Sequence, residues 1–168
     1  MKFKFLYFLL IIFPLTAFSS NTMYLDIPGI EGESQRAGHE DEIDILSWSW
    51  GASVDDHGNA CIQDVAFTKN IDKSSADIIM APITGQVFDT VTLSVRRDSG
   101  DAHLDYLVIA FKDVQVTSVS TGGSQGNLLV DSFTLRFATA TYTYTRIGDD
   151  HSAGEQTTAE IIPSSKCD

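Results

Sequence analysis

Side chains that could perform acid–base, nucleophilic or metal chemistry are scattered along this sequence. Its four histidines, His39, His57, His103 and His151, stand far apart, and it has only two cysteines. The histidines form no HExxH pair and the cysteines form no CxxC pair, which are spacings typical of metal and redox sites. We therefore predict a protein that is not an enzyme and that holds no metal and no cofactor.

Two acidic stretches contain side chains that could bind a cation. "HEDEID" (39–44) and "DDHGN" (55–59) offer carboxylate oxygens and imidazole nitrogens. Neither has the alternating ligand spacing of a calcium-binding loop, so we interpret both as solvated acidic loops. The glycine-rich stretch "TGGSQGN" (121–127) lacks the lysine of a phosphate-binding P-loop and stands between expected strands, which indicates a flexible loop or a wide hairpin turn.

Trp48 and Trp50, in "ILSWSWG" (45–51), could bind a ligand or could be buried. An exposed pair could stack on sugar rings, whereas large aromatic side chains more often fill a core or a subunit interface. A strand places both rings on one face together with Leu46, while a helix would separate the two rings by about 200°. The pattern favours a strand, and composition alone leaves both roles open.

Short runs rich in valine, threonine, tyrosine and phenylalanine predict a mainly β protein. Apolar residues alternate with polar ones in "VTLSV" (91–95) and "FTLRF" (133–137), as in a strand with one buried face. Strands at such spacing predict an antiparallel sandwich or barrel. The expected strands span residues 23–27, 43–50, 61–68, 87–97, 104–111, 113–119, 128–137 and 138–146.

One segment departs from the strand pattern. Residues 72–85 predict a short helix that begins at Ser74 or Ser75 and ends at Gly85. Pro82 should trim or kink its last turn, because proline has no N–H to donate. A helix this short is stable only when it packs on the sheet. Its expected apolar stripe comprises Ile78, Ile79 and Met80.

The N-terminal residues have the three parts of a secretory signal peptide. Lys2 and Lys4 precede an apolar run, Pro14 ends that run, and Ser19 is a small residue suited to cleavage. The apolar run is shorter than the roughly 20 residues of a membrane-spanning helix. We therefore expect residues 1–19 to be removed, and the mature protein to be secreted or periplasmic and free of the membrane.

Charge and length limit the partners and the domain organisation. The formal net charge is −12, and loss of two lysines with the signal peptide would make it −14. A surface of this sign repels phosphate backbones, so we expect no nucleic-acid partner. The length of 168 residues fits one domain, which we place at residues 20–147, followed by a polar C-terminal tail at 148–168.

In an exported protein the two cysteines would meet an oxidising environment. Cys61 and Cys167 could form a disulfide that ties the tail to the domain, or could remain free thiols. A bridge depends on the separation of the two Cα atoms, which the sequence does not give. Both alternatives stay open.

Five stretches of the sequence together form a familiar ordered pattern. They are "GIEGESQ" (29–35), "HEDEIDILSWSWG" (39–51), "IQDVAFTKNIDKSSADIIMAPITG" (62–85), "VTLSVRRDSGDAHLDYLVIAFKDVQVTSVSTGGS" (91–124) and "DSFTLRF" (131–137). Taken in order, from about Met23 to Tyr144, they resemble the haemolysin-coregulated protein (Hcp) family, the tube subunits of bacterial type VI secretion.

The resemblance implies a β-barrel of two antiparallel sheets with one short flanking α-helix. It also implies a non-enzymatic subunit, because family members assemble into hexameric rings that stack into a hollow tube and can carry effectors. The implied partners are other copies of this chain in a homohexameric ring, which could stack, together with effector cargo or secretion-spike proteins. In such a ring one patch of each subunit meets a different patch of the next.

The resemblance places the assembly surfaces in two loops. These are residues 31–42 and the loop after the second tryptophan, "ASVDDHGNAC" (52–61), which looks shorter than in typical tube subunits. The residues expected at the interface are Glu33, Ser34, His39, Glu42, Trp48, Trp50, Asp55 and Asp56.

The signal peptide departs from the family, whose tube subunits normally lack one. Two functions therefore stay open. The first is an exported Hcp-like protein that forms rings of about six subunits. The second is a monomeric exported module that binds a carbohydrate, a cation or a host protein with the same barrel, and it predicts solvent-exposed tryptophans.

Overall fold

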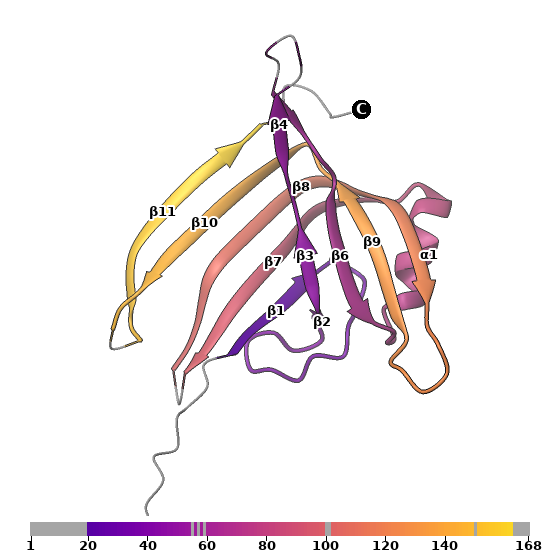
Figure 1. Ribbon diagram of the computed structural model, residues 1–168, viewed down its shortest axis with the longest axis horizontal. Coiled ribbons are helices and arrows are strands. Elements are labelled where there is room, and N and C mark those ends of the chain that lie inside the picture. Colours follow the sequence, from indigo (N-terminus) through magenta and orange to yellow (C-terminus); the bar gives the residue numbers. More distant parts are fainter. Residues whose placement is uncertain are drawn as a thin grey trace, which may run out of the picture.

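The computed structural model describes residues 20–54, 56, 58, 60–99, 102–149 and 151–162. They form eleven strands and one helix (Figure 1), so the predicted mainly β class with one short helix is confirmed. No helix within these residues has the length and apolar character needed to cross a membrane. In chain order the elements are β1 (Ser20–Asp26), β2 (Ile43–Asp44), β3 (Ser47–Ser49), β4 (Ala52–Val54), β5 (Ala60–Ile62), β6 (Val65–Asn70), α1 (Ser75–Thr84), β7 (Val87–Ser99), β8 (Ala102–Gly122), β9 (Val130–Arg136), β10 (Thr139–Ile147) and β11 (Ala153–Ile161).

Nine strands form one antiparallel sheet, and β4 pairs with β5 in a separate two-stranded ribbon. Along the sheet the strands follow the order β2-β1-β7-β8-β9-β6-β3. Strand β10 leaves this path, because it pairs with β8 on one side and with β11 on the other. The sheet therefore has two wings beyond β8, a β10–β11 wing and a β9–β6–β3 wing (Figure 1).

Strand β8 pairs with three other strands. One edge pairs with β7; along the other edge, residues 107–112 pair with β10 and residues 115–122 pair with β9. Asp113 lies between these segments with a φ of 51°, a conformation that is uncommon outside glycine but that aspartate tolerates. The sequence predicted two strands here, 104–111 and 113–119. The structure joins them into one, because no glycine or proline separates them.

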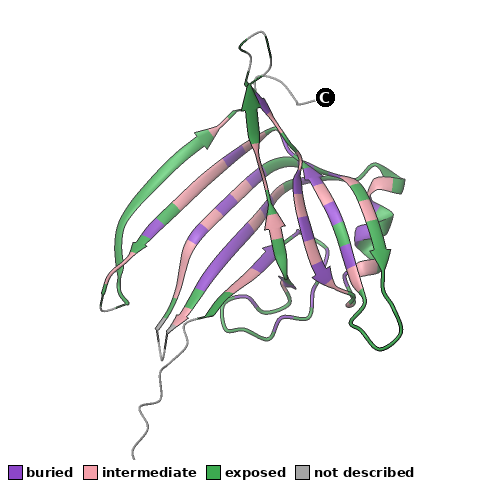
Figure 2. Cartoon of the chain, in the orientation of Figure 1, coloured by how far each residue is buried: buried purple, intermediate pink, exposed green. Residues whose placement is uncertain are grey.

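Both wings contribute to a single apolar core. Phe67 of β6 stacks on Phe133 of β9 with ring centroids 5.4 Å apart, and Phe111 of β8 lies 5.1 Å from Phe137. Figure 2 shows buried residues alternating with less buried ones along β9, whereas β11 is exposed over nearly its whole length. The predicted apolar face is confirmed by the burial of Val91, Leu93, Val95, Phe133, Leu135 and Phe137. The alternation is wrong at Ser94, which was predicted on the polar face and is also buried.

A buried lysine fastens the start of α1 to the sheet. The side chain of Lys69 in β6 is 0% exposed, and its Nζ lies 2.8 Å from Asp72 Oδ1 and 3.3 Å from Asp131 Oδ2. The same ammonium donates a hydrogen bond to Ser75 Oγ at 3.0 Å. Burial acts to raise the pKa of Asp131, but hydrogen bonds from hydroxyl groups and the charge of Lys69 outweigh burial and hold that pKa below its usual value.

Helix α1 packs on the core through fewer residues than predicted. Ile78 and Ala81 are buried, whereas Ile79 and Met80 are 41% and 48% exposed. The expected apolar stripe is therefore wrong for Ile79 and Met80. Successive helical residues point about 100° apart, so three consecutive side chains cannot all face the same sheet.

The ends of α1 agree with the sequence. Ser74 occupies the N-cap position, although its hydroxyl donates to Asp72 Oδ1 at 2.5 Å and makes no cap hydrogen bond to the helix. The helix ends at Thr84, shortly after Pro82, and Gly85 follows in the left-handed conformation with a φ of 68°. The N–H of Gly85 donates to the carbonyl of Ala81, which is a common way to end a helix.

The C-terminal segment differs from the expected tail. We expected no regular structure from Gly148 onward, but Ala153–Ile161 forms β11 and pairs along β10, with Thr158 opposite Thr143. Threonine favours strands. The segment gave no periodic signal because eight of its nine residues are exposed, so neither face had to be apolar.

Replacing Lys69 with methionine removes the cation that lies between two carboxylates. The side chains of Asp72 and Asp131 are only 11% and 4% exposed, so we expect the free energy of unfolding to fall by about 3 to 5 kcal/mol. Urea unfolding followed by circular dichroism measures the loss. Lys73→Met is the control: this side chain is 41% exposed, and its loss should cost much less. Equal losses in the two variants would contradict the role of Lys69.

Candidate functional site

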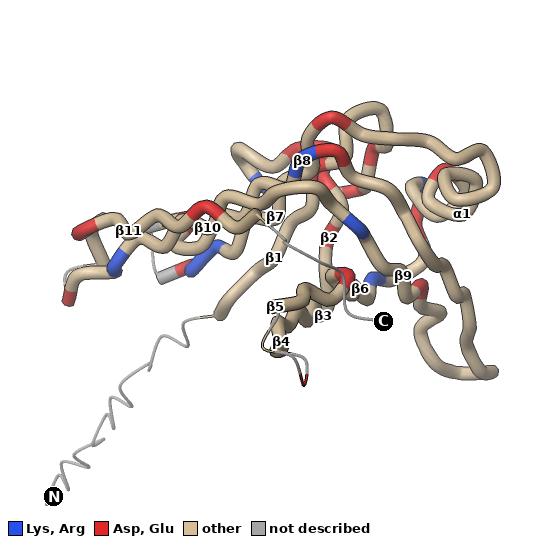
Figure 3. Tube along the Cα trace, turned by 90° about the horizontal axis from the view of Figure 1, so that it is seen from above, with Lys and Arg blue, Asp and Glu red and all other residues tan. Residues whose placement is uncertain are grey.

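The β1–β2 loop, residues 31–42, is a compact structure held by its own backbone. Gly32 N–H donates to the carbonyl of Asp41 at 2.7 Å, Asp41 donates to Ser34 at 2.9 Å, and Ser34 donates to Glu42 at 3.1 Å. A Cβ atom on Gly32 would collide with the carbonyl of Glu42, so glycine lets the two arms approach. Figure 3 shows acidic residues along this loop, which lies on the same side of the sheet as α1; β4 and β5 lie on the opposite side.

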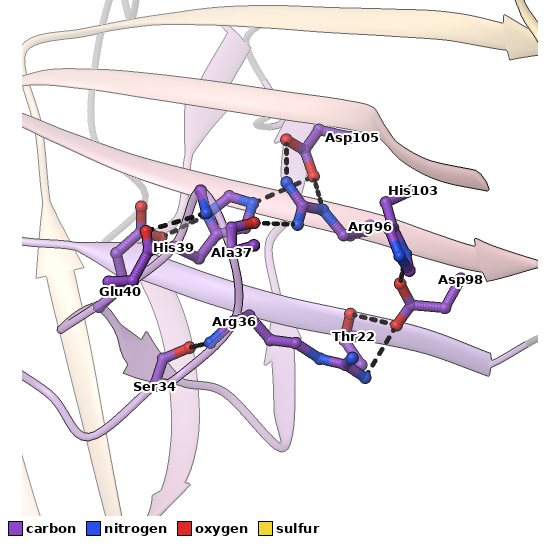
Figure 4. A network of polar contacts seen from close by, with 12 residues as sticks. Thr22, Ser34, Arg36, Ala37, His39, Glu40, Arg96, Asp98, His103 and Asp105 are labelled. Atoms are coloured by element: carbon purple, nitrogen blue, oxygen red, sulfur yellow. Dashed lines mark hydrogen bonds and ion pairs between the residues drawn. The ribbon is translucent and has the colours of Figure 1, made fainter. Parts of the chain in front are cut away.

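His39 ties this loop to two strands of the sheet. Its ring is 5% exposed and stacks on Tyr24 of β1, with centroids 4.3 Å apart and an angle of 9° between the planes. Its Nε2 lies 3.1 Å from Asp105 Oδ1 of β8 (Figure 4). Its Nδ1 lies 2.8 Å from Glu42 Oε2. Burial raises the pKa of Glu42 above its usual value, although the hydrogen bond and charge of His39 act in the opposite direction.

Arg96 of β7 completes the attachment. Its Nε and Nη2 donate to the two oxygens of Asp105 at 2.7 and 3.0 Å, and its Nη1 donates to the carbonyl of Ala37 at 2.8 Å (Figure 4). Burial acts to raise the pKa of Asp105, but hydrogen bonds from Arg96 and His39 outweigh burial and lower it. A bidentate arginine–carboxylate pair fixes geometry as well as charge.

A second set of contacts holds the loop nearer the end of the β7–β8 hairpin. Arg36 Nη2 lies 3.2 Å from Asp98 Oδ2, and Thr22 Oγ1 donates to the same oxygen at 3.4 Å. The other oxygen of Asp98 lies 2.7 Å from His103 Nδ1 (Figure 4). The arginine side chain is 52% exposed, so this pair contributes less than the buried contacts of His39.

The structure brings four predicted residues together in the β1–β2 loop, with two different roles. Ser34 and His39 are buried, and Glu42 is half-buried, so these three position the loop. Glu33 is exposed and accepts a hydrogen bond from the backbone N–H of Lys73 at 3.1 Å, which joins the loop to the start of α1. Of the four, Glu33 is therefore the one available to a neighbouring molecule.

Sequence reasoning missed Arg96 and Asp105, which hold this loop most directly. A signal for them exists: both lie in "VRRDSGDAHLDYL" (95–107), two apolar strands around a turn, where each interrupts the apolar residues. The hairpin register places them opposite each other. Oppositely charged residues paired across a hairpin stabilise it, so the pair could have been proposed; its contact with His39 could not.

Trp48 and Trp50 lie at the opposite end of the strand order from β2, on β3 and just beyond it. Both are half-buried and pack against the core, and the Trp50 ring meets Phe111 and Phe137 edge-on at 5.9 and 5.3 Å. The predicted common face is wrong for Leu46, which is 49% exposed. The chain leaves β2 after Asp44 and begins β3 at Ser47, so one alternation does not continue through this segment.

The loop after Trp50 forms the two-stranded ribbon of β4 and β5. Asp56, near the ribbon's tip, is exposed, whereas Asp55 lies outside the described residues. Cys61 of β5 is buried, with its Sγ 3.1 Å from Ser53 Oγ. Cys167 also lies outside the described residues, so the disulfide between the two cysteines stays a prediction.

Two acidic side chains of the "HEDEID" stretch, considered for cation binding, make other contacts. Glu40 accepts from Gly38 N–H at 2.9 Å and Asp41 pairs with Lys73 at 3.2 Å, and the described residues contain no group of three that could hold a metal ion. "GGSQG" (122–126) has the GxSxG spacing of a nucleophile elbow, but Ser124 lies between β8 and β9 and not between a strand and a helix.

Arg96→Lys keeps the positive charge but removes the paired hydrogen bonds to Asp105 and the bond to Ala37. We expect the free energy of unfolding to fall by about 1 to 3 kcal/mol, and the amides of residues 36–42 to exchange faster with deuterium. Urea unfolding and hydrogen–deuterium exchange measure the two effects. Arg146→Lys, at an exposed position of β10, is the matched control. Unchanged exchange in the Arg96 variant would show that Arg96 does not hold the loop.

Comparison with solved structures agrees with this architecture. Hcp1 from Salmonella typhimurium is 27% identical over 88% of this chain and 95% of that chain, with a TM-score of 0.73. A type VI secretion system effector from Yersinia pestis is 29% identical over 83% of this chain and 98% of that chain, with a TM-score of 0.71.

Comparison of sequences assigns the family. Residues 24–144 match the family described as "Type VI secretion system effector, Hcp". Protein hcp1 of Pseudomonas aeruginosa is 39% identical over 126 residues, which are 69% of this chain and 78% of that protein. The matched residues 24–144 include the β1–β2 loop, its attachment to β7 and β8, and the sheet from the last three residues of β1 to β9. The chain belongs to the Hcp family of type VI secretion proteins.

Proposed function

We propose that this protein is a non-enzymatic, ring-forming subunit of the Hcp type, exported by means of an N-terminal signal peptide. The family assignment supports the connection with type VI secretion. Ring formation is the further step, and it depends on surfaces of this chain that can bind a second copy. In this proposal the protein acts through its shape and its contacts, with other copies of itself as first partner and effector cargo or secretion-spike proteins as further partners.

The open edge of β11 is the observation that carries the proposal of self-association. β11 is the outermost strand of its wing, and within the described residues only β10 pairs with it. Its nine residues include neither lysine nor proline, which often protect exposed strand edges. The strands at the other ends of the sheet, β2 and β3, have only two and three residues. A long open edge offers backbone donors and acceptors to a second chain.

Contacts between unlike surfaces suit a closed ring. If β11 of one copy meets a different surface of the next, the contact is heterologous, and such contacts close into a ring when the rotation permits. The β1–β2 loop and the β4–β5 ribbon lie on opposite sides of the sheet (Figure 3). Glu33 in the loop and Asp56 near the tip of the ribbon are exposed. We propose these two regions as contacts with neighbouring subunits or stacked rings.

Sedimentation velocity over a range of concentrations tests the ring. We expect the protein without residues 1–19 to sediment as a particle of about six subunits. A monomer at every concentration would contradict ring formation while leaving the family assignment intact. The alternative, a monomeric binding module, would then gain support if a carbohydrate or a cation quenched the tryptophan fluorescence.

Proline substitutions locate the edge that binds. Adjacent residues of a strand direct their N–H groups to opposite edges. One of the two substitutions Thr157→Pro and Thr158→Pro therefore removes an N–H on the open edge, and the other removes a hydrogen bond to β10. The variant that keeps the wild-type melting temperature identifies the outward position. We expect this variant to sediment as smaller particles. If it keeps the wild-type size, β11 is not the assembly edge.

The signal peptide has its own test. Expression of the full chain in a Gram-negative host, followed by intact-mass measurement of the periplasmic fraction, should give a protein that begins at Ser20, because cleavage after Ser19 follows the small-residue pattern. A variant with Leu9→Arg and Ile11→Arg, which interrupts the apolar run, should stay unprocessed. Processing of that variant at the same site would contradict export by this route.

A further inference from the structure

Both ring nitrogens of His39 face a carboxyl oxygen, and a neutral ring cannot donate a hydrogen bond to both. Nδ1 lies 2.8 Å from Glu42 Oε2 while Nε2 lies 3.1 Å from Asp105 Oδ1. A neutral imidazole has one N–H, and an ionised carboxylate only accepts. If Nε2–H donates to Asp105, a second proton must lie between Nδ1 and Glu42, on either the ring or the carboxyl group.

The groups around His39 indicate that Nε2 carries a proton and that the second proton lies between Nδ1 and Glu42. Asp105 of β8 is already paired with Arg96 of β7, and its pKa is low, so it stays ionised and accepts from Nε2. Tyr24 of β1 covers the face of the ring and presents no charge there. Glu42, whose pKa is raised by burial, is the group that shares the second proton with Nδ1; Asp26 adds a nearby negative charge that also favours keeping it.

We propose that this shared proton holds the β1–β2 loop in its docked conformation, so that raising the pH favours release of the loop. When the proton leaves, the lone pair of Nδ1 faces an ionised oxygen at hydrogen-bond distance. That contact is repulsive. It lies within the loop, so its loss does not break the bond of Nε2 to Asp105 directly, but the ring loses the carboxyl group that orients it toward Asp105. The inference rests on the proposed function only for its consequence, which is that assembly through this loop would depend on pH.

The direction follows from proton binding. The docked loop binds one proton more than the released loop at the pH where the contact titrates, so raising the pH favours release. At the acid limit the opposite holds for Asp105: its pKa is lowered in the folded protein, so the stability it contributes is lost as the pH falls through that value. The loop is therefore held within a window bounded by Asp105 below and by the shared proton above.

Hydrogen–deuterium exchange of residues 36–42 between about pH 5 and about pH 9, corrected for intrinsic rates, tests the inference. We expect exchange in the wild type to accelerate by about tenfold across the transition, as for loss of a charge-assisted hydrogen bond. Glu42→Gln should remove this step and keep the loop docked, because the carboxamide N–H can donate to Nδ1 of a neutral ring. His39→Gln should remove the step and leave the loop released.

The outcomes separate this inference from ring formation. His151→Gln, in the turn between β10 and β11, is the control and should keep the wild-type step. A wild type without a step, or a step that persists in Glu42→Gln, would overturn the inference. Sedimentation at the same pH values reports assembly separately: a monomer at every pH, combined with a loop step, would refute the ring and leave the proton-held loop standing.

Discussion

The pairing of β8 with three other strands is the constraint on which the rest of the fold depends. Because β10 occupies one part of an edge and β9 the next, the sheet divides into two wings at Asp113. The β9–β6–β3 wing supplies buried apolar residues to the core, whereas the β10–β11 wing adds Ala140 and leaves β11 exposed. The division therefore separates a wing that belongs to the core from a wing with an exposed outer strand.

Buried charged side chains fix the positions of α1 and the β1–β2 loop on the sheet. Lys69 holds the start of α1 to β6 and β9 through two carboxylates, and Arg96 holds the β1–β2 loop to β7 and β8 through Asp105. Apolar contacts are non-directional, whereas a bidentate or fully satisfied ion pair permits one arrangement. Loss of one member of such a set is costly because the other members stay buried.

The sequence predicted correctly the strands and the helix in which one face is buried and the other is exposed to solvent. The strands around Leu93 and Leu135 and the ends of α1 were found in this way, because alternation and capping residues report burial and termination directly. Strand β11 was missed because both its faces are exposed, and Leu46 was misplaced because the chain changes partner strands beside it. Within the site, Ser34, His39 and Glu42 were predicted as interface residues from the family resemblance. The contact of His39 with Asp105 and that of Arg96 with Ala37 depend on tertiary structure that local patterns do not encode.

The charges on β11 give assembly a direction. If two copies paired β11 with β11 antiparallel, with the centre of pairing between Thr157 and Thr158, Glu155 of each copy would stand opposite Glu160 of the other. Like charges directly opposite each other destabilise a strand pair, so a symmetric dimer in this register is disfavoured. If copies associate through this edge, β11 of one copy would then meet a different surface of the next. Each added copy would present its own β11 edge in the same direction, so such an assembly would be polar.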